Sequence, residues 1–241
     1  MDRMRISPLI VALDHGDEDS ATACVDALGE AAERYKVGSV LFTRAGPPLV
    51  AALVGRGRGV FLDLKFHDTP ATVKGAVAAA ADLGVEMLTV HAAGGPGMIA
   101  AARAGAGSSP GAPRILAVTV LTSLDESEWR AVSGPGASPI AEAVSGLARM
   151  TIEAGADGLV CSAHEVGRLR AELGPAPLLV VPGIRPAWSQ SDHSGQSRTA
   201  EPRAALAAGA SYLVIGRAVT ADPDPRAALE RIEADVAAAS R

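Results

Sequence analysis

The sequence predicts a (β/α)₈ TIM barrel, on three observations. Short apolar runs alternate eight times with Ala-rich or amphipathic stretches along the 241 residues. Each stretch is long enough for a right-handed crossover between parallel strands. With 48% hydrophobic residues and a mean hydropathy of +0.22, the chain can bury one large core. We therefore expect residues 1–241 to form a single barrel domain.

The expected strands are short and mostly apolar: 9–13, 35–37, 60–64, 87–91, 115–121, 158–161, 178–181 and 212–215. Helical runs between them include 19–33, 70–83, 138–154 and 202–208. The phrases AADLGVEML, TIEAGADGLV and ALAAGASYLV each indicate a helix end, a Gly turn and a strand. An open doubly wound sheet is the alternative, but its first strand-to-helix turn needs a Gly-rich fingerprint. The segment there is Asp14-His15-Gly16-Asp17, which favours the barrel.

Composition narrows the function classes. Aromatic residues make up 3% of the chain, the net charge is −5 and the pI is about 5.6. These values argue against a nucleic-acid or membrane-surface partner. Cys24 and Cys161 lie far apart without metal-type spacing, which is typical of reduced, buried thiols. The N-terminal apolar run is too short for a secretion signal or a membrane span, so we expect a cytoplasmic protein.

The most informative stretch is FLDLKFHDTPAT, residues 61–72, which places Asp63, Lys65 and Asp68 within six positions. Strand alternation puts Asp63 and Lys65 on one face, where charges are costly unless they pair or act. An ion pair that closes the strand end is the simplest explanation of Asp-x-Lys alone. The second carboxylate, Asp68, favours an ammonium that is kept charged. The chain has three lysines against nineteen arginines, and only lysine can release a proton at working pH.

In a barrel, chemistry belongs at the carboxyl ends of the strands. The polar residues expected at that end are Asp14, Lys36, Asp63, Lys65, His91, Thr122, Arg185 and Arg217. Two loops there are suited to phosphate. Pro182-Gly183-Ile184-Arg185 leads into a polar loop with Gln196 and Arg198, and Gly216-Arg217 precedes a possible helix start. The five histidines show no metal-type spacing, and His91 is interpreted as a structural, hydrogen-bonded residue.

The chain resembles the orotidine 5′-phosphate decarboxylase family, of the bacterial short-chain type, along nearly its whole length. The matching stretches are ALD at 12–14, YKVG at 35–38, FLDLKFHD at 61–68, TVHA at 89–92, VTVLTS at 118–123, VPGIRP at 181–186 and VIGRAVT at 214–220. The resemblance implies a homodimeric barrel that converts orotidine 5′-phosphate to UMP without a metal or cofactor. The family often has Ile where this chain has Thr69, and Asp where it has Gly195.

The resemblance also implies a role for each matching residue. Lys65 would donate a proton to C6, Asp63 would face the departing carboxylate, and Asp68 and Thr72 would reach the neighbouring subunit's site. Asp14 and Lys36 would hold the ribose hydroxyls, and Thr122 the pyrimidine. The phosphate would be bound by Arg185, Gln196, Gly216 and Arg217, and the loop at 186–199 would close over the site.

Two other functions fit the same barrel. One is a related barrel decarboxylase or aldolase that acts on a sugar phosphate with Mg²⁺. That chemistry needs a further carboxylate near Asp63, and residues 60–65 contain no other. The other is a non-catalytic ligand-binding barrel, which would have little use for the complete set of Asp63, Lys65 and Asp68.

Overall fold

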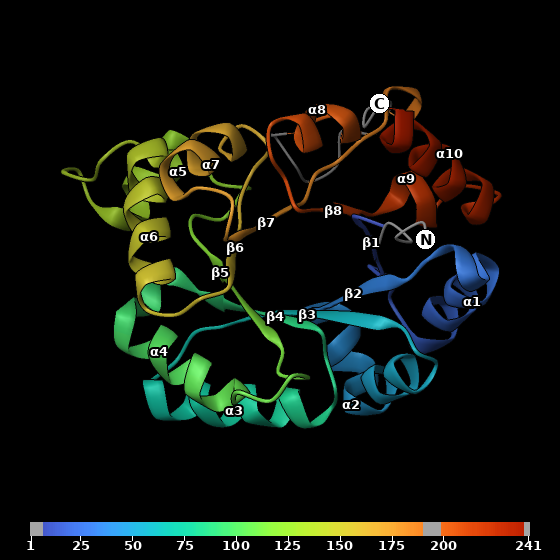
Figure 1. The fold of residues 1–241 in the computed structure, drawn as a ribbon, viewed down its shortest axis with the longest axis horizontal. Coiled ribbons are helices and arrows are strands. Elements are labelled where there is room, and N and C mark those ends of the chain that lie inside the picture. Colours follow the sequence, from blue (N-terminus) through green and yellow to red (C-terminus); the bar gives the residue numbers. More distant parts are fainter. Residues whose placement is uncertain (1–6, 190–198, 239–241) are drawn as a thin grey trace.

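Eight parallel strands close into a barrel in the computed structural model, which describes residues 7–189 and 199–238 (Figure 1). Each strand pairs with the next along the chain, and β1 pairs with β8, so the expected (β/α)₈ topology is confirmed. The strands are β1 Leu9–Ala12, β2 Arg34–Gly38, β3 Gly59–Phe66, β4 Met87–His91, β5 Arg114–Val118, β6 Gly158–Val160, β7 Leu178–Val181 and β8 Tyr212–Ile215.

Helices surround the ring of strands, with α2, α3 and α4 on one side and α8 and α10 on the opposite side (Figure 1). The helices are α1 Glu18–Leu28, α2 Ser39–Gly55, α3 Pro70–Asp82, α4 Gly95–Ala106, α5 Glu126–Ser133, α6 Ile140–Glu153, α7 Val166–Leu173, α8 Pro202–Ala207, α9 Arg217–Thr220 and α10 Pro225–Ala238. The described residues also contain the short 3₁₀ turns η1 Gly29–Ala31, η2 Ala92–Gly94 and η3 Ala187–Ser189. Helix α2 is interrupted at Gly46, which has a φ of 64° and is followed by Pro47 and Pro48.

The core has two layers because the strands are buried on both faces. One layer fills the inside of the barrel, and its buried members are Ile10, Ala12, Phe61, Met87, Leu116, Val180 and Val214. The other layer lies between the strands and the helices and contains most of the remaining apolar side chains. Small residues bring the helices close together. A Cβ atom on Gly105 of α4 would lie 2.4 Å from the Lys74 carbonyl oxygen of α3, so only glycine fits there.

Two strand ends differ from the prediction by two residues or more. The third strand was expected to end at residue 64, but β3 continues to Phe66 with a register shift against β4 between Leu62 and Phe66. The fifth was expected to reach residue 121, but β5 ends at Val118. Its neighbour β6 ends at Val160, the partner of Val118, so no strand is available to pair with the residues beyond.

Within residues 7–189 and 199–238, no helix is both long and apolar enough to cross a membrane. The described helices are instead the amphipathic covers of the barrel, with buried faces that meet the strands.

Candidate active site

A cavity of about 660 Å³ lies at the carboxyl ends of the strands, and we call it the rim cavity. Its floor is apolar and includes Ala12, Phe61 and Val214 from the inside of the barrel. Polar side chains from six of the eight strand ends surround that floor. The residues expected in the site that line it are Asp14, Lys36, Asp63, Lys65, Thr122, Arg185, Gly216 and Arg217.

The end of β3 holds Asp63 and Lys65 in direct contact. Lys65 Nζ lies 2.8 Å from Asp63 Oδ1, and both side chains face the rim cavity. Lys65 has a φ of 52°, and among the described residues it is the only non-glycine with positive φ. A lysine in this conformation costs about 1–3 kcal/mol, and such strain is often found at functional sites. The irregular end of β3 therefore turns the Lys65 ammonium back toward Asp63.

Thr89 of β4 holds this arrangement from beneath. Its side chain is fully buried, its hydroxyl accepts the Lys65 backbone N–H at 2.8 Å, and the same hydroxyl donates to Asp63 Oδ1 at 3.0 Å. One hydroxyl thus fixes both the strained backbone and the carboxylate. The prediction from sequence missed Thr89. The available signal was its position. Strand alternation puts Thr89 on the same face as Met87 and His91, so a polar side chain could have been expected on the inner face of β4.

A second ion pair extends the charged row toward β1. Lys36 Nζ lies 3.0 Å from Asp14 Oδ1 and 3.8 Å from Asp63 Oδ2. Gly38, two residues further on the same face of β2, makes room for this ammonium, because a Cβ atom there would lie 3.0 Å from Lys36 Nζ. Carboxylates and ammonium groups therefore alternate across three strand ends, in the order Asp14, Lys36, Asp63, Lys65. Each charge has an opposite neighbour, which offsets its partial burial.

The loops after β7 and β8 form the other side of the rim cavity. Arg185 lines it, and the Arg185 N–H donates to the Ala200 carbonyl at 2.9 Å, which ties the two ends of the β7–α8 loop together. Gly216 precedes α9, which begins at Arg217, as expected. An arginine from each loop gives this wall donors for an oxyanion. Gln196 and most of the 186–199 loop lie outside the described residues.

Asp68 and Thr72 are not brought together with Lys65 of their own chain. Neither lines the rim cavity, and both are exposed. Asp68 Oδ1 accepts the Thr69 N–H at 2.6 Å, and the hydroxyls of Thr69 and Thr72 lie 3.0 Å apart. A smaller cavity of about 310 Å³ adjoins the charged row and is lined by His15, Ser39 and Val40 as well as by Lys65. We call it the side cavity.

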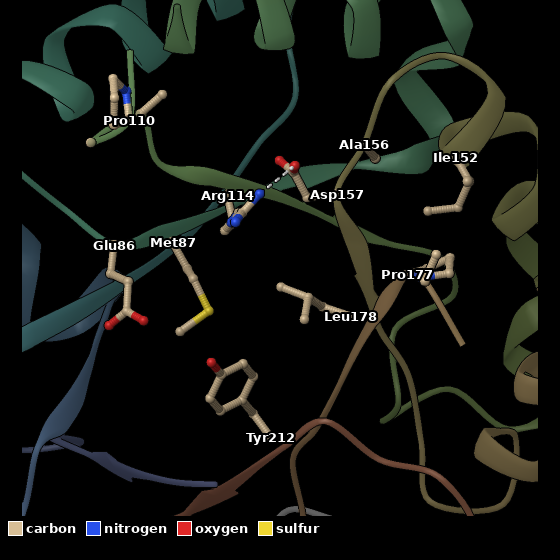
Figure 2. A pocket seen from close by; sticks show the side chains of 13 residues that line it. Glu86, Met87, Pro110, Arg114, Ile152, Ala156, Asp157, Pro177, Leu178 and Tyr212 are labelled. Atoms are coloured by element: carbon tan, nitrogen blue, oxygen red, sulfur yellow. Dashed lines mark hydrogen bonds and ion pairs between the residues drawn. The ribbon is translucent and has the colours of Figure 1, made fainter. Parts of the chain in front are cut away.

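Another cavity, of about 640 Å³, lies at the opposite end of the barrel. Figure 2 shows Met87, Leu178 and Tyr212, the first residues of β4, β7 and β8, around it. Its charges are used by structural pairs: Arg114 and Arg103 both contact Asp157, at 3.4 and 2.8 Å (the first pair is dashed in Figure 2). In barrels of this type the amino end serves stability and the carboxyl end serves chemistry. The rim cavity is therefore the candidate active site.

No group of three or more His, Cys, Asp or Glu side chains suited to a metal ion occurs in the part of the chain that the structure describes. What the rim cavity offers is a row of paired charges against an apolar floor, opposite two arginines. Such a site can bind an anionic group at one end and present an ammonium to a reacting atom at the other.

Comparison with known proteins assigns the family. The model of the orotidine 5′-phosphate decarboxylase / HUMPS family matches residues 7–232. A protein named orotidine 5′-phosphate decarboxylase from Nitrosococcus oceani is 50% identical over 233 residues, which are 97% of this chain and 99% of that protein. One of the same name from Salmonella typhimurium is 51% identical over 95% of this chain and 93% of that protein.

Solved structures agree with this assignment. The crystal structure of orotidine 5′-phosphate decarboxylase from Lactobacillus acidophilus superposes with a TM-score of 0.85 at 39% identity, covering 96% of this chain and 99% of that one. An uncharacterized conserved protein from Geobacillus kaustophilus gives a TM-score of 0.82 at 36% identity, with 95% and 100% covered. The chain therefore belongs to the orotidine 5′-phosphate decarboxylase / HUMPS family.

Proposed function

We propose that this chain decarboxylates orotidine 5′-phosphate to UMP in pyrimidine biosynthesis, within a single catalytic domain, and that Lys65 is its proton donor. The observation that carries the proposal is the contact of 2.8 Å between Lys65 Nζ and Asp63 Oδ1 inside the rim cavity. It places an ammonium and a carboxylate side by side over an apolar floor, where a flat pyrimidine ring would lie.

The proton and electron balance of the proposed decarboxylation needs only the residues of the rim cavity and solvent. The bond between C6 and the carboxylate breaks, CO₂ leaves, and the electron pair stays on C6. Lys65 then donates a proton from Nζ to C6, and solvent returns a proton to the amine. The ammonium acts before this transfer as well, because a fixed positive charge beside C6 stabilises negative charge as it develops there. Asp63 faces the departing carboxylate and keeps Lys65 in position.

The other residues of the rim cavity bind the parts of the substrate that do not react. Asp14 and Lys36 hold the ribose hydroxyls, and Thr122 contacts the pyrimidine. Arg185, Gly216 and Arg217 bind the phosphate, together with Gln196. Enzymes lower barriers by about 8 to 23 kcal/mol, more than one lysine can supply. Binding energy from the remote phosphate is a second source, because it can be used to hold the reacting carbon in place.

The active form in this proposal is a cytoplasmic homodimer. Asp68 and Thr72 are exposed and do not line their own rim cavity, while the side cavity next to Lys65 has room for further groups. In a two-fold dimer each chain would supply Asp68 and Thr72 to the other's site. A carboxylate that arrives beside Lys65 would give its ammonium a second acidic neighbour.

An absorbance assay with orotidine 5′-phosphate tests this function. We expect conversion to UMP at the same rate with and without EDTA. Lys65→Ala should abolish it, whereas Lys74→Ala, a matched lysine that lines neither the rim nor the side cavity, should leave it unchanged.

The two alternatives give different results in the same assay. Loss of activity in EDTA with recovery in Mg²⁺ would indicate metal-dependent sugar-phosphate chemistry. Tight binding of orotidine 5′-phosphate without turnover would indicate a ligand-binding barrel. Either result contradicts the proposal.

A further inference from the structure

Two histidines form a stacked pair just beyond the charged row. The rings of His67 and His91 have centroids 5.2 Å apart and an angle of 22° between their planes. His91 is the last residue of β4, and His67 follows the last residue of β3. Backbone pairing of these strands ends at Phe66 and Val90, so the two histidines are the next residue on each strand. The stack continues the β3–β4 contact by one step, through side chains.

His91 is the fixed member of the pair. It is partly buried, and its Nδ1 accepts the backbone N–H of Ala93 at 3.3 Å, in the η2 turn that follows β4. An acceptor at Nδ1 requires the neutral ring. Burial is the main cause that lowers the pKa of His91, and electrostatic repulsion from His67 and Lys65 lowers it further. The lowered pKa agrees with a neutral ring. His67 is exposed, and the contact described for its ring is the stack with His91.

His67 immediately precedes Asp68. The hydrogen bonds described for residues 68–72 are local: Asp68 with the Thr69 N–H, Thr69 with Thr72, and the Val73 N–H with the Thr69 carbonyl. These contacts shape the segment, but none of them attaches it to β4. The His67–His91 stack extends the attachment to β4 one residue beyond the Phe66–Val90 pairing, directly before the residue that the proposed dimer places in the partner's site.

We propose that His91, through its stack with His67, is a positioning residue that holds the β3–α3 segment so that Asp68 and Thr72 enter the active site of the partner subunit. The inference rests on the proposed function and on its dimer, and it makes a distinctive claim. Although His91 lies near Lys65 of its own chain, its loss should damage the site of the other chain.

Subunit mixing tests this claim. We expect His91→Ala to lower kcat/KM about ten- to hundred-fold, the size of effect that follows from a misplaced active-site group. His91→Ala is then unfolded, mixed in equal amounts with Lys65→Ala or with Asp68→Ala, and refolded. Mixed dimers are verified by mass.

The two mixtures should differ. In a dimer of His91→Ala with Lys65→Ala, one site combines an intact Lys65 with an intact β3–α3 segment, so about a quarter of all sites in the mixture become wild type. In a dimer of His91→Ala with Asp68→Ala, each site receives a defective segment, and activity should stay at the average of the parents. Recovery with Asp68→Ala, or recovery with neither partner, would overturn the inference.

Conservative variants separate stacking from the hydrogen bond. His91→Phe keeps a flat ring and loses the acceptor, whereas His91→Asn keeps an acceptor and loses the ring. We expect His91→Phe to retain several-fold more activity than His91→Asn, and the reverse order would contradict a role through the stack. His67→Ala, at the exposed partner, should reproduce the mixing pattern if His91→Ala does not fold. His164→Ala, at an exposed histidine outside both cavities, is the matched control and should be fully active.

A mixture of Lys65→Ala with Asp68→Ala keeps the two proposals distinguishable. If that mixture gains activity while the His91→Ala mixtures do not show the expected difference, the shared site stands and the role of His91 is wrong. If that mixture itself gains nothing, the shared site is wrong.

Discussion

Lys65 is constrained from three directions. Its backbone is held at a φ of 52°, its N–H donates to the buried Thr89 hydroxyl, and its ammonium contacts Asp63. A flexible lysine side chain ordinarily loses about 1.5–2 kcal/mol of conformational freedom when it is fixed. Here the surrounding contacts fix it before any substrate binds. Such preorganisation is what a site needs if it is to stabilise charge at the moment of reaction.

Lys65→Arg should be nearly as damaging as Lys65→Ala. Arginine keeps the positive charge, but it is a planar group that does not release its proton at working pH. We expect both variants to lose at least about three orders of magnitude in kcat. Proton transfer by a positioned side chain alone typically contributes about 10²–10⁴-fold, so the expected loss exceeds the lower end of that range. The measurement is the rate of UMP formation. If Lys65→Arg kept most of the activity, Lys65 would be an electrostatic or structural residue only.

Thr89→Val tests the support beneath Lys65. The substitution keeps the shape of the side chain and removes the hydroxyl, which leaves the Lys65 N–H and one Asp63 oxygen without this partner. We expect a loss of about 1–3 kcal/mol in the free energy of unfolding, measured in urea, and a fall in kcat.

Thr119→Val is the matched control for that substitution. Thr119 is also buried, but within the described residues its hydroxyl has no hydrogen-bond partner, so its removal should cost nothing in stability or rate. Equal effects of the two substitutions would contradict a specific role for Thr89.

At the scale of elements, the strands could be predicted from sequence because each is a short apolar run followed by a turn and a helix. The residues at which the strands end were harder to predict. The β5 boundary depends on the length of β6, which the residues of β5 do not encode. The irregular end of β3 depends on the Thr89 contact from β4 and could not be read from the alternation of Asp63 and Lys65. Thr89 itself was missed because threonine is a common strand residue.

Arg217 tests the loop after β8 as a phosphate site. We expect Arg217→Ala to lower kcat/KM by about two orders of magnitude or more, because phosphate binding energy is used in the transition state. Unfolding in urea should be nearly unchanged. In the wild-type protein, added phosphite should restore part of the activity toward a substrate that lacks the phosphate.

The control is Arg226→Ala, an exposed arginine of α10 that pairs with Glu230 and should be silent. No activation by phosphite, together with an unchanged kcat/KM in Arg217→Ala, would remove Arg217 from the site.

At the scale of the whole molecule, the closed barrel explains why a site can be predicted from residues spread along the chain. Asp14 and Arg217 are about two hundred positions apart, yet β1 pairs with β8 and both residues line one cavity. The rule that chemistry lies at the carboxyl ends therefore brought eight of the expected residues together. A contact between two chains obeys no such rule, so the placement of Asp68 and Thr72 in the partner's site stays a prediction from the family resemblance.

The central claim is that each active site combines Lys65 of one chain with Asp68 of the other. Subunit complementation measures this most directly. Lys65→Ala and Asp68→Ala, each nearly inactive, are unfolded, mixed in equal amounts and refolded. Half of the dimers are then mixed, and each mixed dimer has one site with both defects and one with neither. Decarboxylation of orotidine 5′-phosphate should rise to about a quarter of the wild-type rate per site. Activity that stays at the level of the parents, with mixed dimers confirmed by mass, would show that Asp68 serves its own chain.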